Sequence, residues 1–128
     1  MISIEICIDV PDLERGIRFY AEAFGFSKVA EPYPGVVVLK VGEVAITLLE
    51  KADQSRPSPH TRDLRHYDRH WTPVHVDFHV DDVKAALDRA VSAGAIKEQF
   101  FAEPGHGQVA FCADPFGNGF CILGNKAE

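Results

Sequence analysis

The sequence repeats one pattern at an offset of 70 residues, and this repeat constrains the fold more than any other feature. Residues 5–13 (EICIDVPDL) and 75–83 (HVDFHVDDV) both alternate polar and apolar side chains. Such alternation is typical of a β-strand whose two faces lie in different environments. Each segment reaches an acidic residue, Asp12 or Asp82, that can cap the first turn of a following helix. We therefore expect two similar modules that both begin with a strand and a helix.

The segments that follow also correspond. Apolar side chains recur at helical spacing after both acidic residues, and a glycine, Gly25 or Gly94, stands at each expected helix end. Residues 114–118 (DPFGN) predict an architectural turn. Further apolar runs predict strands near residues 28–31, 36–39 and 44–49 in the first half and near 97–101, 109–112 and 120–123 in the second.

The 128 residues fit a single domain, 1–128, built from two such modules. We expect module 1 over about residues 1–50, a connecting loop over 51–73 and module 2 over about 74–124. The loop carries five basic and three acidic residues together with three prolines. It fits either a solvated linker or the interface of a homodimer, in which Tyr67 and Trp71 would be anchors.

Composition excludes several classes of function. The net charge of −6 argues against a general nucleic-acid binder, and the absence of an apolar run of about 18 residues argues against a membrane span. Met1 leads directly into an alternating segment, so we expect no secretory leader. The three cysteines, an odd number without metal-knuckle spacing, indicate reduced thiols and a cytoplasmic location.

Several short motifs occur in a fixed order along almost the whole chain: Asp12-Leu13, Phe19-Tyr20, Gly25-Phe26, His75 with Phe78, Val80 and Asp81-Asp82, Gly94-Ala95, and residues 114–118. In this order they resemble the vicinal oxygen chelate superfamily of glyoxalases, bleomycin-resistance proteins and extradiol dioxygenases. The resemblance implies an α+β fold in which two tandem βαβββ modules form a cupped, barrel-like mixed sheet around a small-molecule site, commonly in a homodimer. It implies no single reaction, because the superfamily includes lyases, isomerases, oxygenases and binding proteins.

Strand alternation predicts which side chains line this cup. If the apolar positions of the two opening strands pack against the helices, the cup receives the alternate residues: Glu5, Cys7, Asp9, His75, Asp77 and His79. His75 and Asp77 would lie about 6.6 Å apart at the backbone, close enough to converge on one ion with Glu5. The same alternation also fits a merely polar, non-ligating strand face.

Enzymes of the superfamily place metal ligands at four equivalent points, which fall here on Glu5, Thr47, His75 and Cys121. His75 is the usual histidine, Glu5 is an oxygen donor in place of a histidine, and Cys121 is a third ligand as thiolate. Thr47 is a poor ligand. The resemblance therefore implies a divalent metal (zinc, manganese, iron or nickel) on Glu5, His75 and Cys121, and a thiolate favours zinc.

Two hypotheses for function follow. In the first, the chain is a metal-assisted enzyme acting on a small oxygen-rich or anionic molecule, of lyase, isomerase or dioxygenase type. Asp77, His79 and His106 would then move protons, and Arg69 with its neighbouring loop arginines would attract the substrate. In the second, it is a metal-free binding protein of the bleomycin-resistance type, with Trp71 and Phe116 among the aromatic residues that line a cavity, joined by Phe100 and Phe101.

Overall fold

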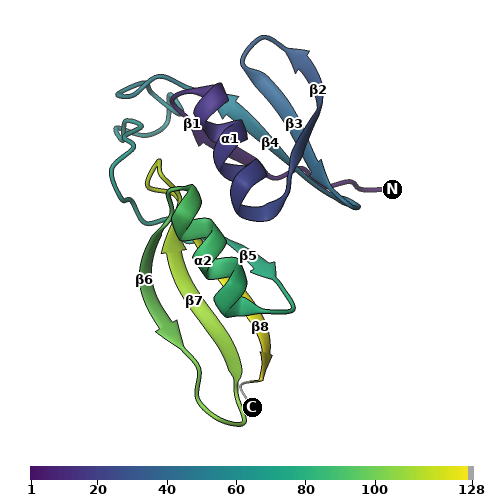
Figure 1. Ribbon diagram of the computed structural model, residues 1–128. Coiled ribbons are helices and arrows are strands. Elements are labelled where there is room, and N and C mark those ends of the chain that lie inside the picture. Colours follow the sequence, from purple (N-terminus) through teal and green to yellow (C-terminus); the bar gives the residue numbers. More distant parts are fainter. Residues whose placement is uncertain (127–128) are drawn as a thin grey trace. The chain divides into compact units, whose positions relative to one another are not determined.

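A computed structural model describes residues 1–126 and shows two compact units. The first unit ends at Tyr67 and the second begins at Asp68, inside the connecting segment that follows the first module. Each unit contains one helix and one four-stranded sheet (Figure 1). Neither helix within the described residues is long and apolar enough to cross a membrane.

The first unit has the order β-α-β-β-β. Its elements are β1 (Cys7–Val10), α1 (Leu13–Phe24), β2 (Ser27–Tyr33), β3 (Val36–Val41) and β4 (Val44–Glu50). The strands lie in the order β1-β4-β3-β2, with β1 parallel to β4 and the other neighbours antiparallel. The short strand that opens the chain therefore pairs with the last strand of its own unit.

The second unit repeats this topology. Its elements are β5 (Val76–His79), α2 (Val83–Ala93), β6 (Ile96–Phe101), β7 (Gly107–Ala113) and β8 (Gly119–Lys126). The strand order is β5-β8-β7-β6, and β5 runs parallel to β8. The α+β fold class with two βαβββ modules, predicted from the repeat, is confirmed.

Both helices begin and end where the sequence predicts. An Oδ1 atom of Asp12 accepts a hydrogen bond from the Arg15 backbone N–H at 3.2 Å, and Asp82 caps α2 in the same way through Ala85 at 3.0 Å. At the end of α1, Gly25 has a φ of 81°, a left-handed conformation that few other residues adopt without strain.

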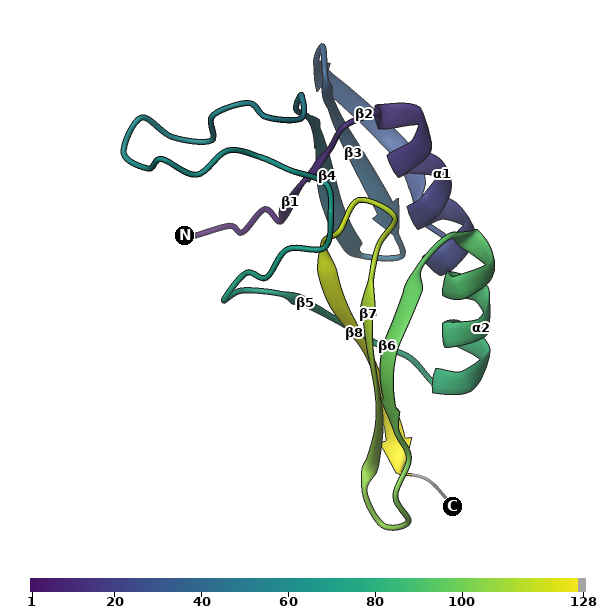
Figure 2. The same ribbon diagram turned by 90° about the vertical axis from the view of Figure 1, so that its left-hand side faces the viewer.

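Each helix covers one face of its own sheet, as Figure 2 shows for both units. In the first unit this face is apolar: Leu39 and Leu48 of the sheet are buried, as is Phe19 of α1. In the second unit Ile122 of the sheet and Leu87 of α2 are buried in the same way. The opposite face of each sheet carries the polar positions of the opening strand, so the alternation in the sequence separates core from candidate site.

The turn over residues 114–118 is held by one buried carboxylate. The side chain of Asp114 accepts hydrogen bonds from the backbone N–H groups of Phe116 (2.8 Å) and Asn118 (3.0 Å) and from the Asn118 side-chain amide (3.0 Å). The segment 68–70 packs on this turn, and the His70 N–H donates to the Gly117 carbonyl at 3.2 Å. The predicted architectural turn therefore also fixes the end of the connecting segment.

Candidate functional site

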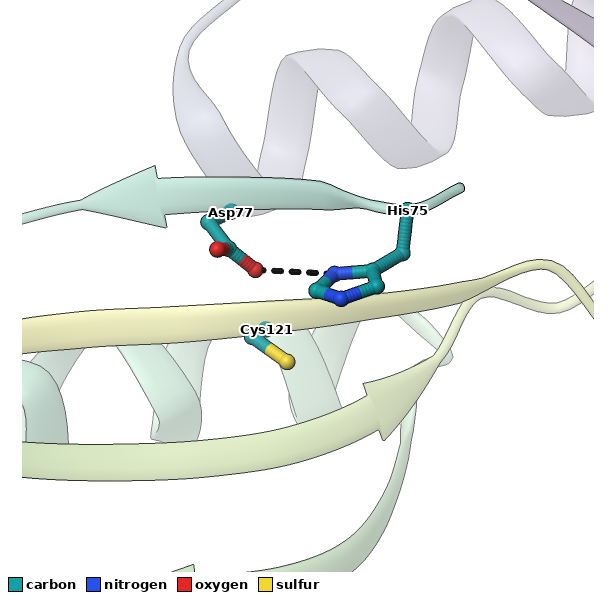
Figure 3. Close-up of side chains that lie close together, drawn as sticks. All are labelled: His75, Asp77 and Cys121. Atoms are coloured by element: carbon teal, nitrogen blue, oxygen red, sulfur yellow. Dashed lines mark ion pairs between the residues drawn. The ribbon is translucent and has the colours of Figure 1, made fainter. Parts of the chain in front are cut away.

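The second unit brings together three side chains of metal-ligating type. His75 directly precedes β5, Asp77 lies on β5, and Cys121 lies on β8. One potential ligand atom from each lies within 4.8 Å of those of the other two, and Figure 3 shows the three side chains side by side. Among the described residues, His75, Asp77 and Cys121 form the one group of at least three such side chains whose ligand atoms are close enough to share an ion.

Strand pairing explains why these residues meet. Asp77 and Cys121 are register partners in the parallel β5–β8 pair, so their side chains leave the sheet on the same face. His75 is two residues before Asp77 and shares that face. The cluster therefore depends on the β5–β8 register, and a shift by one residue would separate its members.

An ion pair joins two of the three members. His75 Nδ1 lies 3.0 Å from Asp77 Oδ1 (Figure 3). When Nδ1 carries the proton and donates it to the carboxylate, the lone pair of Nε2 is available to a metal. Asp77 then fixes the orientation of the imidazole ring and keeps its second oxygen for the ion or for a substrate proton.

The thiol of Cys121 is the buried member of the cluster, with an exposed fraction of 7%. Burial, and secondly the negative charge of Asp77 together with a hydrogen bond to it, raises the pKa of Cys121 to about 11. Glu98 adds a smaller effect in the same direction. Without a cation the group is therefore a thiol at neutral pH, and a metal must displace its proton to bind it.

The donor set fits a divalent transition metal. Zinc binds imidazole nitrogen, carboxylate oxygen and thiolate sulfur at about 2.0–2.3 Å, which places neighbouring ligands about 3.3–3.8 Å apart. The three atoms here lie within 4.8 Å, so small side-chain rotations bring them to that spacing. Three protein ligands leave a fourth position for water or a substrate oxygen.

The first unit carries a matching set of positions with different residues. Glu5 and Cys7 correspond to His75 and Asp77 at the offset of 70, and Cys7 pairs with Thr47 as Asp77 pairs with Cys121. The buried Thr47 hydroxyl donates a 2.7 Å hydrogen bond to Glu5 Oε1. Glu5 is therefore engaged within its own unit, and its role as a metal ligand stays a prediction.

The three residues predicted to move protons do not lie together. Asp77 belongs to the cluster, and His79 lies two residues farther along β5 on the same face, beside Leu123 of β8. His106 lies in the turn between β6 and β7, where its N–H donates to the Glu103 carbonyl at 3.1 Å. His106 is five positions before Phe111, the register partner of Cys121, so it lies about 16 Å along the sheet from the cluster.

The residues predicted to bind substrate also differ in exposure. Trp71 is 80% exposed, whereas Phe116 is 1% exposed and packs inside the core of the second unit. Phe116 lies in the 114–118 turn, where its backbone N–H donates to Asp114 Oδ1 at 2.8 Å. Arg69 forms an ion pair with Glu98 of β6, a partner that the sequence pattern did not reveal.

Comparison with known proteins agrees with this architecture. A family model described as a glyoxalase-like domain matches residues 5–123. The chain belongs to this glyoxalase-like family. The resemblance to the vicinal oxygen chelate superfamily is thereby confirmed, and the match covers both units of the glyoxalase-like chain. No curated protein matches the sequence.

Solved structures show the same fold at low sequence identity. The hypothetical protein SA1046 from S. aureus is 20% identical, with a TM-score of 0.72 over 98% of each chain. A lactoylglutathione lyase from Agrobacterium tumefaciens is 20% identical, with a TM-score of 0.66 over 97% of this chain and 93% of that one. The fosfomycin resistance protein FosX from Listeria monocytogenes is 17% identical, with a TM-score of 0.73 over 98% of this chain and 96% of that one. At these identities the likeness establishes the glyoxalase-like fold, and the reaction must be argued from the site.

Proposed function

We propose that this glyoxalase-like protein is a divalent-metal-assisted enzyme acting on a small oxygen-rich or anionic molecule. The observation that carries the proposal is the convergence of His75, Asp77 and Cys121 within 4.8 Å on one sheet face. A metal held there would polarise a substrate oxygen and stabilise negative charge that develops on it.

The donor set favours zinc and a reaction without electron transfer. A buried cysteine is a soft ligand that suits zinc, whereas ring-cleaving iron sites use two imidazoles and one carboxylate. The cluster has a single imidazole, from His75. We therefore favour lyase or isomerase chemistry over dioxygenation, with manganese, iron and nickel as the other metals to be tested.

The chain's own residues have separate tasks in this proposal. His75, Asp77 and Cys121 hold the metal, and the Oδ1 atom of Asp77 also keeps the imidazole ring oriented through its 3.0 Å contact with Nδ1. The ring of His79 lies on the face where substrate would bind and is the first candidate for proton transfer. Asp77 takes this task only when its second oxygen does not bind the metal. We assign no such task to His106, which lies about 16 Å along the sheet.

Metal analysis of the untagged protein, purified without chelators, tests the proposal. We expect about one transition-metal ion per chain, or uptake of one zinc after reloading, with loss in His75→Ala and Cys121→Ser. His79→Ala is the matched control, because it removes an imidazole from the same strand and face outside the cluster. A chain that takes up no zinc, manganese, iron or nickel, or one whose metal is unaffected by His75→Ala, would refute the proposal.

A metal-free binding protein is the second candidate, and the first unit favours it. There the matching positions hold Glu5, Cys7 and Thr47, and the Glu5 carboxylate is hydrogen-bonded to the threonine hydroxyl. Only half of the duplicated scaffold thus carries a strong donor set. Zinc titration distinguishes the two ideas: uptake of one ion per chain that is lost in His75→Ala supports the enzyme, and a chain that takes up no divalent ion supports the binding protein.

A further inference from the structure

The Arg69–Glu98 pair has the geometry of a carboxylate-binding site. Arg69 Nε donates to Glu98 Oε2 at 2.7 Å, and Nη2 donates to Oε1 at 3.1 Å. Two parallel N–H···O bonds of this kind are the way in which a guanidinium recognises a carboxylate. Both side chains remain partly accessible to solvent, at 41% for Arg69 and 33% for Glu98.

The guanidinium is held in place independently of Glu98. Arg69 Nη1 contacts the backbone carbonyls of His70 and Gly117, the latter at 3.4 Å. The neighbouring His70 anchors the segment through its ring, which lies 2.9 Å from Asn118 Oδ1. Removal of the Glu98 carboxylate would therefore leave the guanidinium ordered and its outer N–H groups available.

A glycine gives the guanidinium its place on the sheet. A Cβ atom added at Gly119 would lie only 2.8 Å from Arg69 Nη2 and 3.0 Å from Nη1, so the Arg69 side chain covers β8 where a side chain is lacking. Gly119 and Cys121 are two residues apart on β8 and face the same side. The guanidinium thus shares the face of the metal-ligating cluster, about 6–7 Å along the strand.

We propose that Arg69 binds a carboxylate group of the substrate and that Glu98 occupies this anion subsite when no substrate is present. The inference rests on the proposed function, which places the reacting oxygen of the substrate at the cluster. It defines the substrate class as a small carboxylic acid that carries a second oxygen group about 6–7 Å from the carboxylate. Trp71 follows the same segment and is exposed, but the proposal needs no contact with it.

Glu98 should lower the affinity of Arg69 for an external carboxylate only modestly. A partly exposed ion pair contributes little, so an entering carboxylate displaces Glu98 at small cost. On this basis Glu98→Gln, which removes the competing charge and keeps the shape, raises carboxylate affinity about two- to fivefold. A purely structural ion pair predicts no anion binding in either protein.

Acetate is a suitable probe for the full-length, chelator-treated protein. The side-chain Nε–H resonance of Arg69 is followed by ¹H–¹⁵N NMR while acetate replaces chloride at constant ionic strength. We expect a saturable shift in the native protein and a two- to fivefold lower dissociation constant in Glu98→Gln. Arg69→Lys keeps the charge but loses the two parallel N–H donors of the guanidinium. We expect it to weaken acetate binding by at least fivefold, measured from the shifts of neighbouring backbone amides.

The control variant is Glu31→Gln, which removes one negative charge from the Lys28–Glu31 pair of the first unit at 3.1 Å. We expect it to leave acetate binding unchanged. A dissociation constant lowered equally by Glu31→Gln and Glu98→Gln, or no saturable response in Glu98→Gln, would overturn the proposal. Because these measurements use metal-free protein, their failure would not affect the metal analysis, and failure of metal uptake would not affect them.

Discussion

Replacement of Gly117 by alanine should destabilise the second unit through two separable effects. Gly117 has a φ of 83°, and a Cβ atom placed on it would lie 2.0 Å from the Asp68 carbonyl oxygen. Real Cβ atoms almost never approach another atom closer than 3.0 Å, so the segment 68–70 must move by at least about 1 Å. The left-handed backbone adds strain of about 1 kcal/mol for a residue with a side chain.

The displacement breaks identifiable contacts. The His70 N–H donates to the Gly117 carbonyl at 3.2 Å, and the His70 ring contacts Asn118 at 2.9 Å. At about 1 kcal/mol for each of the two, the displacement costs about 2 kcal/mol beyond the strain. We therefore expect Gly117→Ala to lower the free energy of unfolding by about 3 kcal/mol.

Gly105→Ala is the control, because Gly105 also has a φ of 83° but no atom within 4 Å of an added Cβ. It shares the strain and the entropic effect on the unfolded chain, and we expect a loss of about 1 kcal/mol. Urea unfolding followed by circular dichroism measures both variants, provided that their m-values agree. Equal destabilisation by the two substitutions would refute the argument from the Asp68 contact.

Three further outcomes follow from the described contacts. Zinc affinity should rise about tenfold per pH unit between pH 7 and 9, because the pKa of Cys121 is raised to about 11 and zinc binding releases its proton. Competition titrations measure this dependence, and the Cys121→Ser variant should show a flatter slope. Asp114→Ala should cost about 3 kcal/mol of unfolding free energy, since its carboxylate holds three hydrogen bonds in a buried turn, whereas the helix cap variant Asp12→Ala should cost about 1 kcal/mol; equal losses in urea unfolding would contradict this. Iodoacetamide should modify the exposed Cys7 first, and mass spectrometry should find Cys112, whose pKa burial raises to about 11, protected in the folded chain.

The local features of the fold could be predicted from the sequence because they have local causes. Alternation marked both opening strands, and Asp12, Asp82, Gly25 and Gly94 marked the helix ends. Strand lengths were less accurate: the strand expected near 28–31 extends over Ser27–Tyr33, because backbone pairing with β3 continues past the apolar residues. The homodimer and the cytoplasmic location stay predictions.

The site was only partly predictable, because its contacts join residues far apart in the chain. From the sequence we expected His75 and Cys121 as ligands, and Asp77 as a proton carrier that can also reach the same ion as His75, but only the β5–β8 register shows Asp77 beside Cys121. Polar pairs between loop and sheet leave no periodic signal, so Arg69–Glu98 was not expected. Phe116 was expected to line a cavity because aromatic character alone does not distinguish a core ring from a binding surface.

The duplicated strand register has a consequence for how such a protein can change. The two halves provide equivalent sets of positions in the sheet. One set holds Glu5, Cys7 and Thr47, and the other holds His75, Asp77 and Cys121. Substitutions in the first set alter a hydrogen bond, whereas substitutions in the second alter the proposed chemistry. One half of the polypeptide can therefore accumulate new side chains, and with them new ligands, while the other keeps the donor set of the proposed metal site.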